Sequence, residues 1–186
     1  SACGNEIASE KPMVRKYIID SLCYWASEYH IDGFRFDLMG VLDIETLNEA
    51  RKALLKINPD IIMYGEGWTG GESTLPESER GMKINAPRTP GIGMFSDDIR
   101  DAVKGHVFYM DELGFVNGAA DRGEELKQAV TCAKWAKSPM QSINYLSCHD
   151  NYTLWDRFII SNSHESEEMR IRMNKLAAAI LFTAQG

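Results

Sequence analysis

Three carboxylates occupy positions where short apolar strands are expected to end. Asp37 follows the segment GFRF, Glu66 lies between two glycines after IIMY, and Asp150 closes the segment INYLSCHD. Two carboxylates about 5 to 5.5 Å apart are the chemical groups of a retaining glycoside hydrolase. One attacks the anomeric carbon, and the other first protonates the leaving oxygen and then activates water. These residues could therefore cleave a glycosidic bond, provided that one parallel sheet brings them together.

The neighbours of Asp37 and Glu66 predict different roles for the two carboxylates. Alternation along residues 31–40 turns Arg35 and Asp37 to the same side of a strand, so Arg35 should keep Asp37 ionised, as a nucleophile requires. Trp68 places aromatic surface near Glu66, which disfavours the ionised form and suits a general acid. Asp150 can hold sugar hydroxyls. The structural alternatives are an ion pair that only fixes the strand and a turn that happens to contain Glu66.

The elements that must position these groups can be predicted from hydrophobic periodicity. Strands are expected at 31–40, 61–68, 94–96 and 143–150, and helices at 12–29, from an N-cap at Asp43 to Asn58–Pro59, at 97–109, at 124–135 and from Met169 to the end. The long polar segment 69–93 reads as a loop. A loop of that length usually forms a lid or a wall of a site.

Strands that alternate with helices imply an α/β fold with a parallel sheet, whose strand ends converge on one face. A closed (β/α)8 TIM barrel needs about 250 residues, so the 186 residues correspond to about half of one. We therefore expect residues 1–186 to be a partial catalytic barrel domain, an excerpt of a longer chain. Its partner would be the remainder of the barrel, and its exposed apolar edges favour self-association and low activity of the isolated segment.

Composition excludes several other classes of function. The chain is 44% hydrophobic and 25% charged, with a net charge of -7, and so lacks the basic surface that nucleic acid requires. No apolar run is long enough to span a membrane, and nothing in the sequence assigns a compartment. The four cysteines form no CxxC pair, which argues against a zinc site or a disulfide framework and favours core thiols. No organic cofactor is predicted, because no phosphate-binding glycine motif is present.

The segments GFRFDLMG, YGEGW and SCHDN together resemble short motifs of the α-amylase superfamily, and their wording is similar to its type I pullulanase branch. The similarity extends to CGNEIASEKPMVRKYI and FSDDIRDAVKGHVF, so it covers nearly the whole chain. The resemblance implies a glycosidase that cleaves α-1,6 branch linkages in pullulan and related α-glucans of starch and glycogen metabolism. Members of the family can bind calcium, but this segment offers no recognisable calcium site.

The resemblance also implies roles for individual residues. Asp37 matches the nucleophile, Glu66 the general acid/base and Asp150 the stabiliser of the transition state. Residues implied to bind substrate or to orient the nucleophile are Arg35, His149, Trp68, Met39 and Asn151. For His149 the alternative is a structural pair with its neighbour, and for Met39 it is an ordinary core position. The family's first motif, an Asp followed four residues later by Asn-His, is absent from this chain.

Three other functions fit part of the pattern. An α-1,4-acting or dual-specificity amylase would keep the same site and cleave a different bond. A non-catalytic α-glucan-binding barrel would be expected to lose a catalytic carboxylate, and all three are present. A metal-dependent lyase would also place carboxylates at strand ends, but the chain offers no convincing set of ligands for Mg²⁺ or Zn²⁺.

Overall fold

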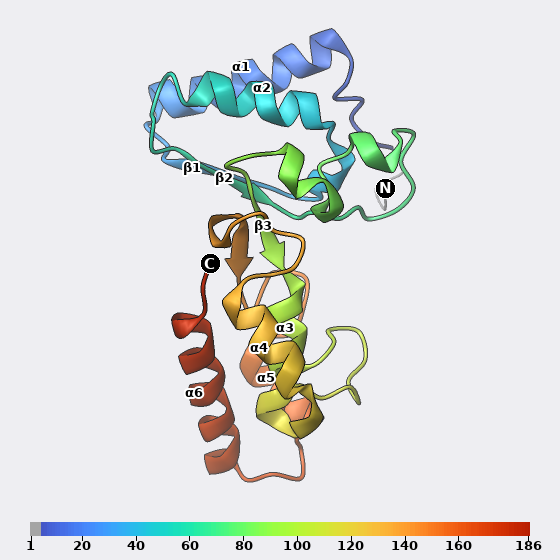
Figure 1. Ribbon diagram of the computed structural model, residues 1–186, viewed down its shortest axis with the longest axis vertical. Coiled ribbons are helices and arrows are strands. Elements are labelled where there is room, and N and C mark those ends of the chain that lie inside the picture. The colour runs from blue at the N-terminus through green and yellow to red at the C-terminus, as the bar shows by residue number, and fades with distance from the viewer. Residues whose placement is uncertain (1–4) are drawn as a thin grey trace. The chain divides into compact units, whose positions relative to one another are not determined.

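The computed structural model describes residues 5–186, which form two compact units (Figure 1). The first unit contains the described residues up to Phe95 together with Trp135–Gln141. The second contains Ser96–Lys134 and Ser142–Gly186. Strands alternate with helices along the chain, which confirms the predicted α/β class.

The first unit is a parallel sheet covered on one face by two helices. Its strands β1 (Gly33–Phe36), β2 (Ile62–Gly65) and β3 (Gly93–Ser96) pair in chain order, with Phe36 opposite Gly65 and Gly65 opposite Met94. The helices α1 (Pro12–Glu28) and α2 (Ile44–Leu54) lie side by side over this sheet (Figure 1). Because β1 and β2 run parallel, their carboxyl ends lie at the same edge of the sheet.

Local sequence explains where the helices of the first unit begin. Pro12 occupies the start of α1, where a missing N–H costs nothing. Asp43 caps α2 by accepting a hydrogen bond from the N–H of Thr46, as predicted. Leu47, Ala50 and Leu54 of α2 pack into the apolar core between helices and sheet. Outside α2, this core contains Met39, Leu42, Ile61, Met63, Ile92 and Met94.

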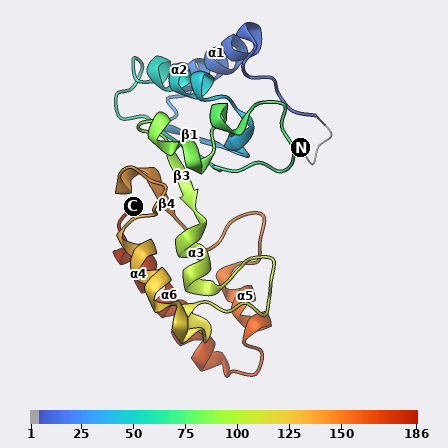
Figure 2. The same ribbon diagram turned by 45° about the vertical axis from the view of Figure 1, so that its right-hand side comes forward.

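The second unit is mainly helical. It contains α3 (Asp97–Lys104), α4 (Gly123–Thr131), the short strand β4 (Ser142–Asn144), α5 (Leu154–Ser161) and α6 (Glu167–Thr183). Figure 2 shows α3, α4 and α6 packed side by side. Their core is formed by Ile99, Ala102, Val103, Val116, Ala129, Leu146, Phe158 and Ala177.

Several predicted boundaries were wrong. The strand expected at 61–68 ends at Gly65, and the strand expected at 143–150 ends at Asn144, because apolar residues continue beyond the paired backbone. Helix α3 ends before Gly105, whose φ of 86° lies in the region that favours glycine. Helix α1 ends at Glu28, one residue before the predicted end.

Within the segment predicted as a loop, two short 3₁₀ helices form at Glu77–Glu79 and Lys83–Arg88. Cys23, Cys132 and Cys148 are free thiols of intermediate burial, and Cys23 packs against the core of the first unit. Cys3 lies outside the described residues. Among residues 5–186 there is no helix with the length and apolar character needed to cross a bilayer.

Candidate active site

The first unit brings Arg35, Asp37 and Glu66 together at the carboxyl edge of its sheet. Arg35 lies in β1, Asp37 directly follows that strand, and Glu66 directly follows β2. Because Phe36 and Gly65 are paired across the two strands, the next residue of each strand leaves the sheet at the same level. The strand pairing therefore places the two carboxylates beside each other, as the sequence predicted.

Arg35 bridges the two carboxylates. Its Nη1 donates to Oδ1 of Asp37 at 2.5 Å, and its Nη2 donates to Oε1 of Glu66 at 2.6 Å. The guanidinium carbon also lies 5.6 Å from the centre of the Phe95 ring, within range of a cation–π contact. The predicted pair of Arg35 with Asp37 is thus present, and the same side chain holds Glu66 in addition.

Glu66 is deeply buried and hydrogen-bonded through both carboxylate oxygens. Only 3% of the residue is exposed, and its Oε2 accepts a hydrogen bond from the backbone N–H of Leu38 at 2.7 Å. Together with the contact to Arg35, this gives one donor to each oxygen. The neighbouring Trp68 predicted aromatic surroundings for this carboxylate. Its actual partners are polar, and they fix the direction in which the carboxylate points.

The glycines on either side of Glu66 serve packing inside the protein. A Cβ atom at Gly65 would collide with the carbonyl oxygen of Phe36 and with Met39. At Gly67 it would collide with Lys83 and Met94. These two glycines therefore let the end of β2 pass close to its protein neighbours.

Met39 and Trp68 were both predicted to shape the substrate site, and the structure places them differently. Met39 is 0% exposed and packs in the core of the first unit, which is the structural alternative considered for it. Trp68 is partly exposed, beyond the end of β2. The ammonium group of Lys83 lies 5.2 Å from the centre of the Trp68 ring and so covers part of one ring face.

The remaining predicted residues lie in the second unit, in a turn that follows β4. Nε2 of His149 lies 3.2 Å from Oδ1 of Asp150, and more than half of each side chain is exposed. The side chain of Asn151 donates to Sγ of Cys148 at 3.4 Å. A second contact closes the turn, because Ser147 Oγ accepts a hydrogen bond from the N–H of Leu154 at 2.9 Å. These residues therefore sit on a hydrogen-bonded turn rather than at a strand end.

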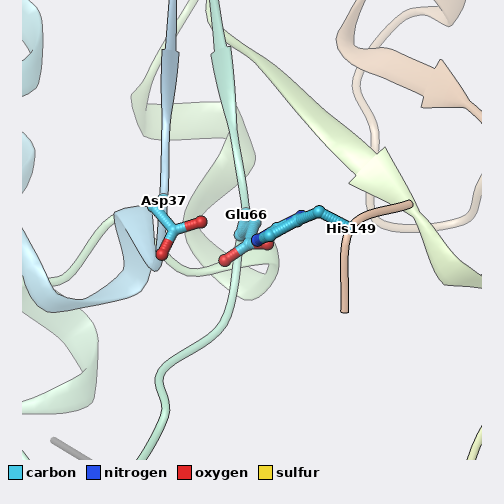
Figure 3. A group of neighbouring side chains, drawn as sticks. All are labelled: Asp37, Glu66 and His149. Carbon is cyan, nitrogen blue, oxygen red and sulfur yellow. The ribbon is translucent and has the colours of Figure 1, made fainter. Parts of the chain in front are cut away.

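The spacing of Asp37 and Glu66 decides what the pair can do chemically. A carboxylate oxygen of Asp37 lies within 4.8 Å of one of Glu66, and Figure 3 shows the two side chains next to each other. Inverting glycosidases keep their carboxyl groups about 6.5 to 9.5 Å apart so that a water molecule fits beside the sugar. In retaining enzymes the two carboxyl groups lie about 5 to 5.5 Å apart, and the close approach of these two oxygen atoms is compatible with that arrangement, in which one carboxylate attacks the sugar directly.

Sequence reasoning missed three participants in this site. Leu38 contributes only its backbone N–H, which any residue except proline has, so no side-chain signal marks it. Phe95 lies in β3, which neighbours β2 in the sheet, and its place could have been derived from strand order. Lys83 comes from the 69–93 segment, which is consistent with the prediction that this segment forms a wall of the site.

Comparison with curated proteins identifies relatives that span nearly the whole chain. The pullulanase of Bacillus subtilis is 41% identical and matches 98% of this chain, and a chloroplastic pullulanase of Arabidopsis thaliana is 32% identical and matches all of it. This chain covers 26% and 25% of those two proteins, respectively. It thus spans about a quarter of the length of the relatives. No family model matches the chain.

Solved structures give the same result. The pullulanase of Anoxybacillus sp. LM18-11 in complex with maltotetraose matches 98% of the chain with a TM-score of 0.95 and 46% identity. The type I pullulanase of Bacillus subtilis in complex with maltose matches all of it with a TM-score of 0.95 and 40% identity. The chain covers 27% of each of these structures. Over almost its whole length, the chain is therefore homologous to a segment of the type I pullulanases.

Proposed function

We propose that the protein hydrolyses α-1,6-glucosidic linkages in pullulan and related α-glucans with retention of configuration. The single observation that carries this proposal is the pair of carboxylates whose oxygens approach within 4.8 Å, both bound to Arg35. The names of the relatives, and the maltooligosaccharides bound in their structures, support the α-glucan as substrate. Because the chain matches only a quarter of those relatives, the activity is assigned to the protein as a whole.

In this mechanism Asp37 is the nucleophile. Its carboxylate attacks the anomeric carbon and forms a glycosyl ester, while Glu66 gives its proton to the leaving glycosidic oxygen. Glu66 then takes a proton from water, and the resulting hydroxide displaces Asp37 from the sugar. Arg35 holds both groups in position throughout the two steps. The proton that leaves with the first product is thus replaced by one from water.

Asp150 and His149 are the residues we propose for binding the sugar ring at the cleaved bond. Both side chains are more than half exposed on the turn after β4, so their polar atoms are not consumed by packing. A carboxylate that accepts hydrogen bonds from sugar hydroxyls can stabilise a distorted ring as positive charge develops at the anomeric carbon. Asn151 and Trp68 would contact neighbouring parts of the glucan, Trp68 through its aromatic face.

The decisive experiment is a pullulan digest with the natural full-length protein, with products sized by chromatography. Release of maltotriose would establish α-1,6 cleavage, since pullulan joins maltotriose units by that bond. Proton NMR of the first product would give its anomeric configuration, and an initial α-anomer would establish retention. Products cut at α-1,4 bonds would instead identify an amylase, and binding of pullulan without any product would identify a glucan-binding protein.

A further inference from the structure

Leu38, the residue after Asp37, has a backbone conformation that leucine rarely adopts. Its φ and ψ are 42° and 48°, in the left-handed region. Among residues 5–186, only His30 shares a positive φ without being glycine. In this region the Cβ atom crowds the backbone, and leucine has no polar side chain that could compensate by a local hydrogen bond. A strained residue directly after a nucleophile requires a structural reason.

The left-handed turn aims the backbone of this segment at the end of β2. The N–H of Leu38 donates to Oε2 of Glu66 at 2.7 Å. Two residues later, the N–H of Gly40 lies 3.1 Å from the carbonyl oxygens of both Glu66 and Trp68. Leu38 also begins a 3₁₀ turn, because its carbonyl oxygen accepts a hydrogen bond from the N–H of Val41 at 2.9 Å. The turn thus fixes the Leu38 N–H against a buried carboxylate.

We propose that Leu38 is a positioning residue, whose left-handed backbone sets the carboxylate of Glu66 relative to Asp37. Arg35 holds one oxygen of Glu66 and the Leu38 N–H holds the other, so the carboxylate cannot rotate without losing a bond. Both donors flank Asp37 in sequence. The segment that carries the nucleophile therefore also orients the acid/base, and this role rests on the function proposed above.

Substitutions that differ in their tolerance of the left-handed region test this role in the natural full-length protein. Leu38→Val introduces a β-branched side chain, which that region disfavours most, whereas Leu38→Asn and Leu38→Gly accept it. We expect Leu38→Val to lower kcat on pullulan about 100-fold with little change in KM, since a small misplacement of a catalytic group costs about that much. For the other two variants we expect kcat within about threefold of the natural protein.

Thermal unfolding of the three variants separates geometry from loss of fold. The Leu38 side chain lies against Gly70, so all three variants should lose some packing. Equal losses of kcat in all three would assign the effect to that side chain and overturn the proposal. It would also fail if folded Leu38→Val kept kcat within about threefold of the natural value.

Residue-resolved hydrogen exchange tests the contact without any measurement of activity. Glu66→Ala removes the acceptor, and we expect the Leu38 amide to exchange about tenfold faster in that variant. Glu66→Gln keeps an acceptor oxygen and should preserve the protection. The Gly40 amide is an internal control, because it bonds to backbone carbonyls and should not respond.

Unchanged exchange at Leu38 in Glu66→Ala would overturn the proposal, as would equal acceleration at Gly40. A natural protein that releases no maltotriose but shows the expected exchange pattern would contradict the proposed function alone. The two failures are thereby distinguishable.

Discussion

Arg35 joins the two proposed catalytic groups through separate nitrogen atoms of one side chain. Nη1 serves Asp37 and Nη2 serves Glu66, and a planar guanidinium presents both donors in a fixed geometry. A lysine ammonium carries the same charge but only one nitrogen. The site therefore depends on the shape of Arg35 as well as on its charge.

Replacing Arg35 by lysine should consequently impair catalysis while preserving charge. We expect Arg35→Lys to lower kcat on pullulan by about 10- to 100-fold with a smaller change in KM, because catalytic groups lose orientation more than substrate loses binding. Steady-state kinetics, with circular dichroism as the control for folding, would measure this. Activity equal to that of the natural protein would show that a positive charge alone suffices.

The roles of Asp37 and Glu66 can be separated by the choice of leaving group. We expect Asp37→Asn and Glu66→Gln each to lower turnover of pullulan by about three orders of magnitude while binding remains measurable. A maltosyl or maltotriosyl fluoride needs no protonation on departure, so Glu66→Gln should regain the first step and release a burst of fluoride, whereas Asp37→Asn should not. Hydrolysis of the glycosyl ester should stay slow in Glu66→Gln, because Glu66 is the base for that step. Rescue of the Asp37 variant instead would mean that the two assignments must be exchanged.

Among the elements, strands were found reliably from the sequence but their ends were not. Strand β4 ends at Asn144, although the apolar residues Tyr145 and Leu146 follow it. The end of a strand is set by where the neighbouring strand stops pairing with it, which the strand's own sequence does not show. Helix α5, which begins at Leu154 shortly after the SCHDN motif, was not predicted. The convergence of Asp37 and Glu66 was predictable, because parallel strands share one carboxyl edge. The Leu38 contact was not, because it depends on one backbone dihedral angle.

Helix α2 depends on the carboxylate of Asp43, which is buried at its N-terminus. Burial opposes ionisation, but hydrogen bonds from Ser9 and Thr46 and the charge of Arg15 outweigh it, so the pKa of Asp43 lies below its usual value. A lowered pKa means that the folded state prefers the ionised carboxylate. The resulting stabilisation is present above the unfolded pKa of about 3.9 and is lost as pH falls through the lower folded value.

Removing this cap should destabilise the protein in a pH-dependent way. We expect Asp43→Ala to lower the free energy of unfolding by about 2 kcal/mol at pH 7, and Asp43→Asn, which still caps a helix, by about half as much. Denaturant titrations at pH 7 and near pH 3 would measure both variants. The gap between the natural protein and Asp43→Asn should narrow at the lower pH, and a constant gap would rule out the ionised carboxylate as its source.

At the scale of the whole molecule, an acidic chain keeps three cations inside its second unit. Arg100, Lys104 and Arg157 are 8%, 2% and 1% exposed. Arg100 is bound by Asp101 and the hydroxyl of Tyr145, and Arg157 by the carbonyls of Tyr109 and Glu112. Within residues 5–186 the side chain of Lys104 has neither a hydrogen bond nor an ion pair. Burial, together with the charges of Arg100 and Arg157, lowers the pKa of Lys104 to about 8.

This lysine should make stability increase with pH above neutrality. In the unfolded chain its pKa is about 10.4, so between about pH 8 and 10.4 the unfolded state holds a proton that the folded state has released. The free energy of unfolding therefore rises across that window. Below about pH 8, Lys104 is protonated in both the folded and the unfolded state. The folded state then carries the full cost of burying the ammonium group, on the order of 3 kcal/mol.

Lys104→Met should remove that cost, because it keeps the apolar stem and deletes the charge. We expect it to stabilise the protein at pH 7 by about 1 to 3 kcal/mol and to flatten the rise in stability between pH 8 and 10. Lys127→Met is the matched control, since Lys127 is an exposed residue of α4 that pairs with Glu124 and should leave both quantities unchanged. Denaturant titrations at pH 7 and 9.5 would measure all three proteins. A pH slope that survives in Lys104→Met would place its origin in another titrating group.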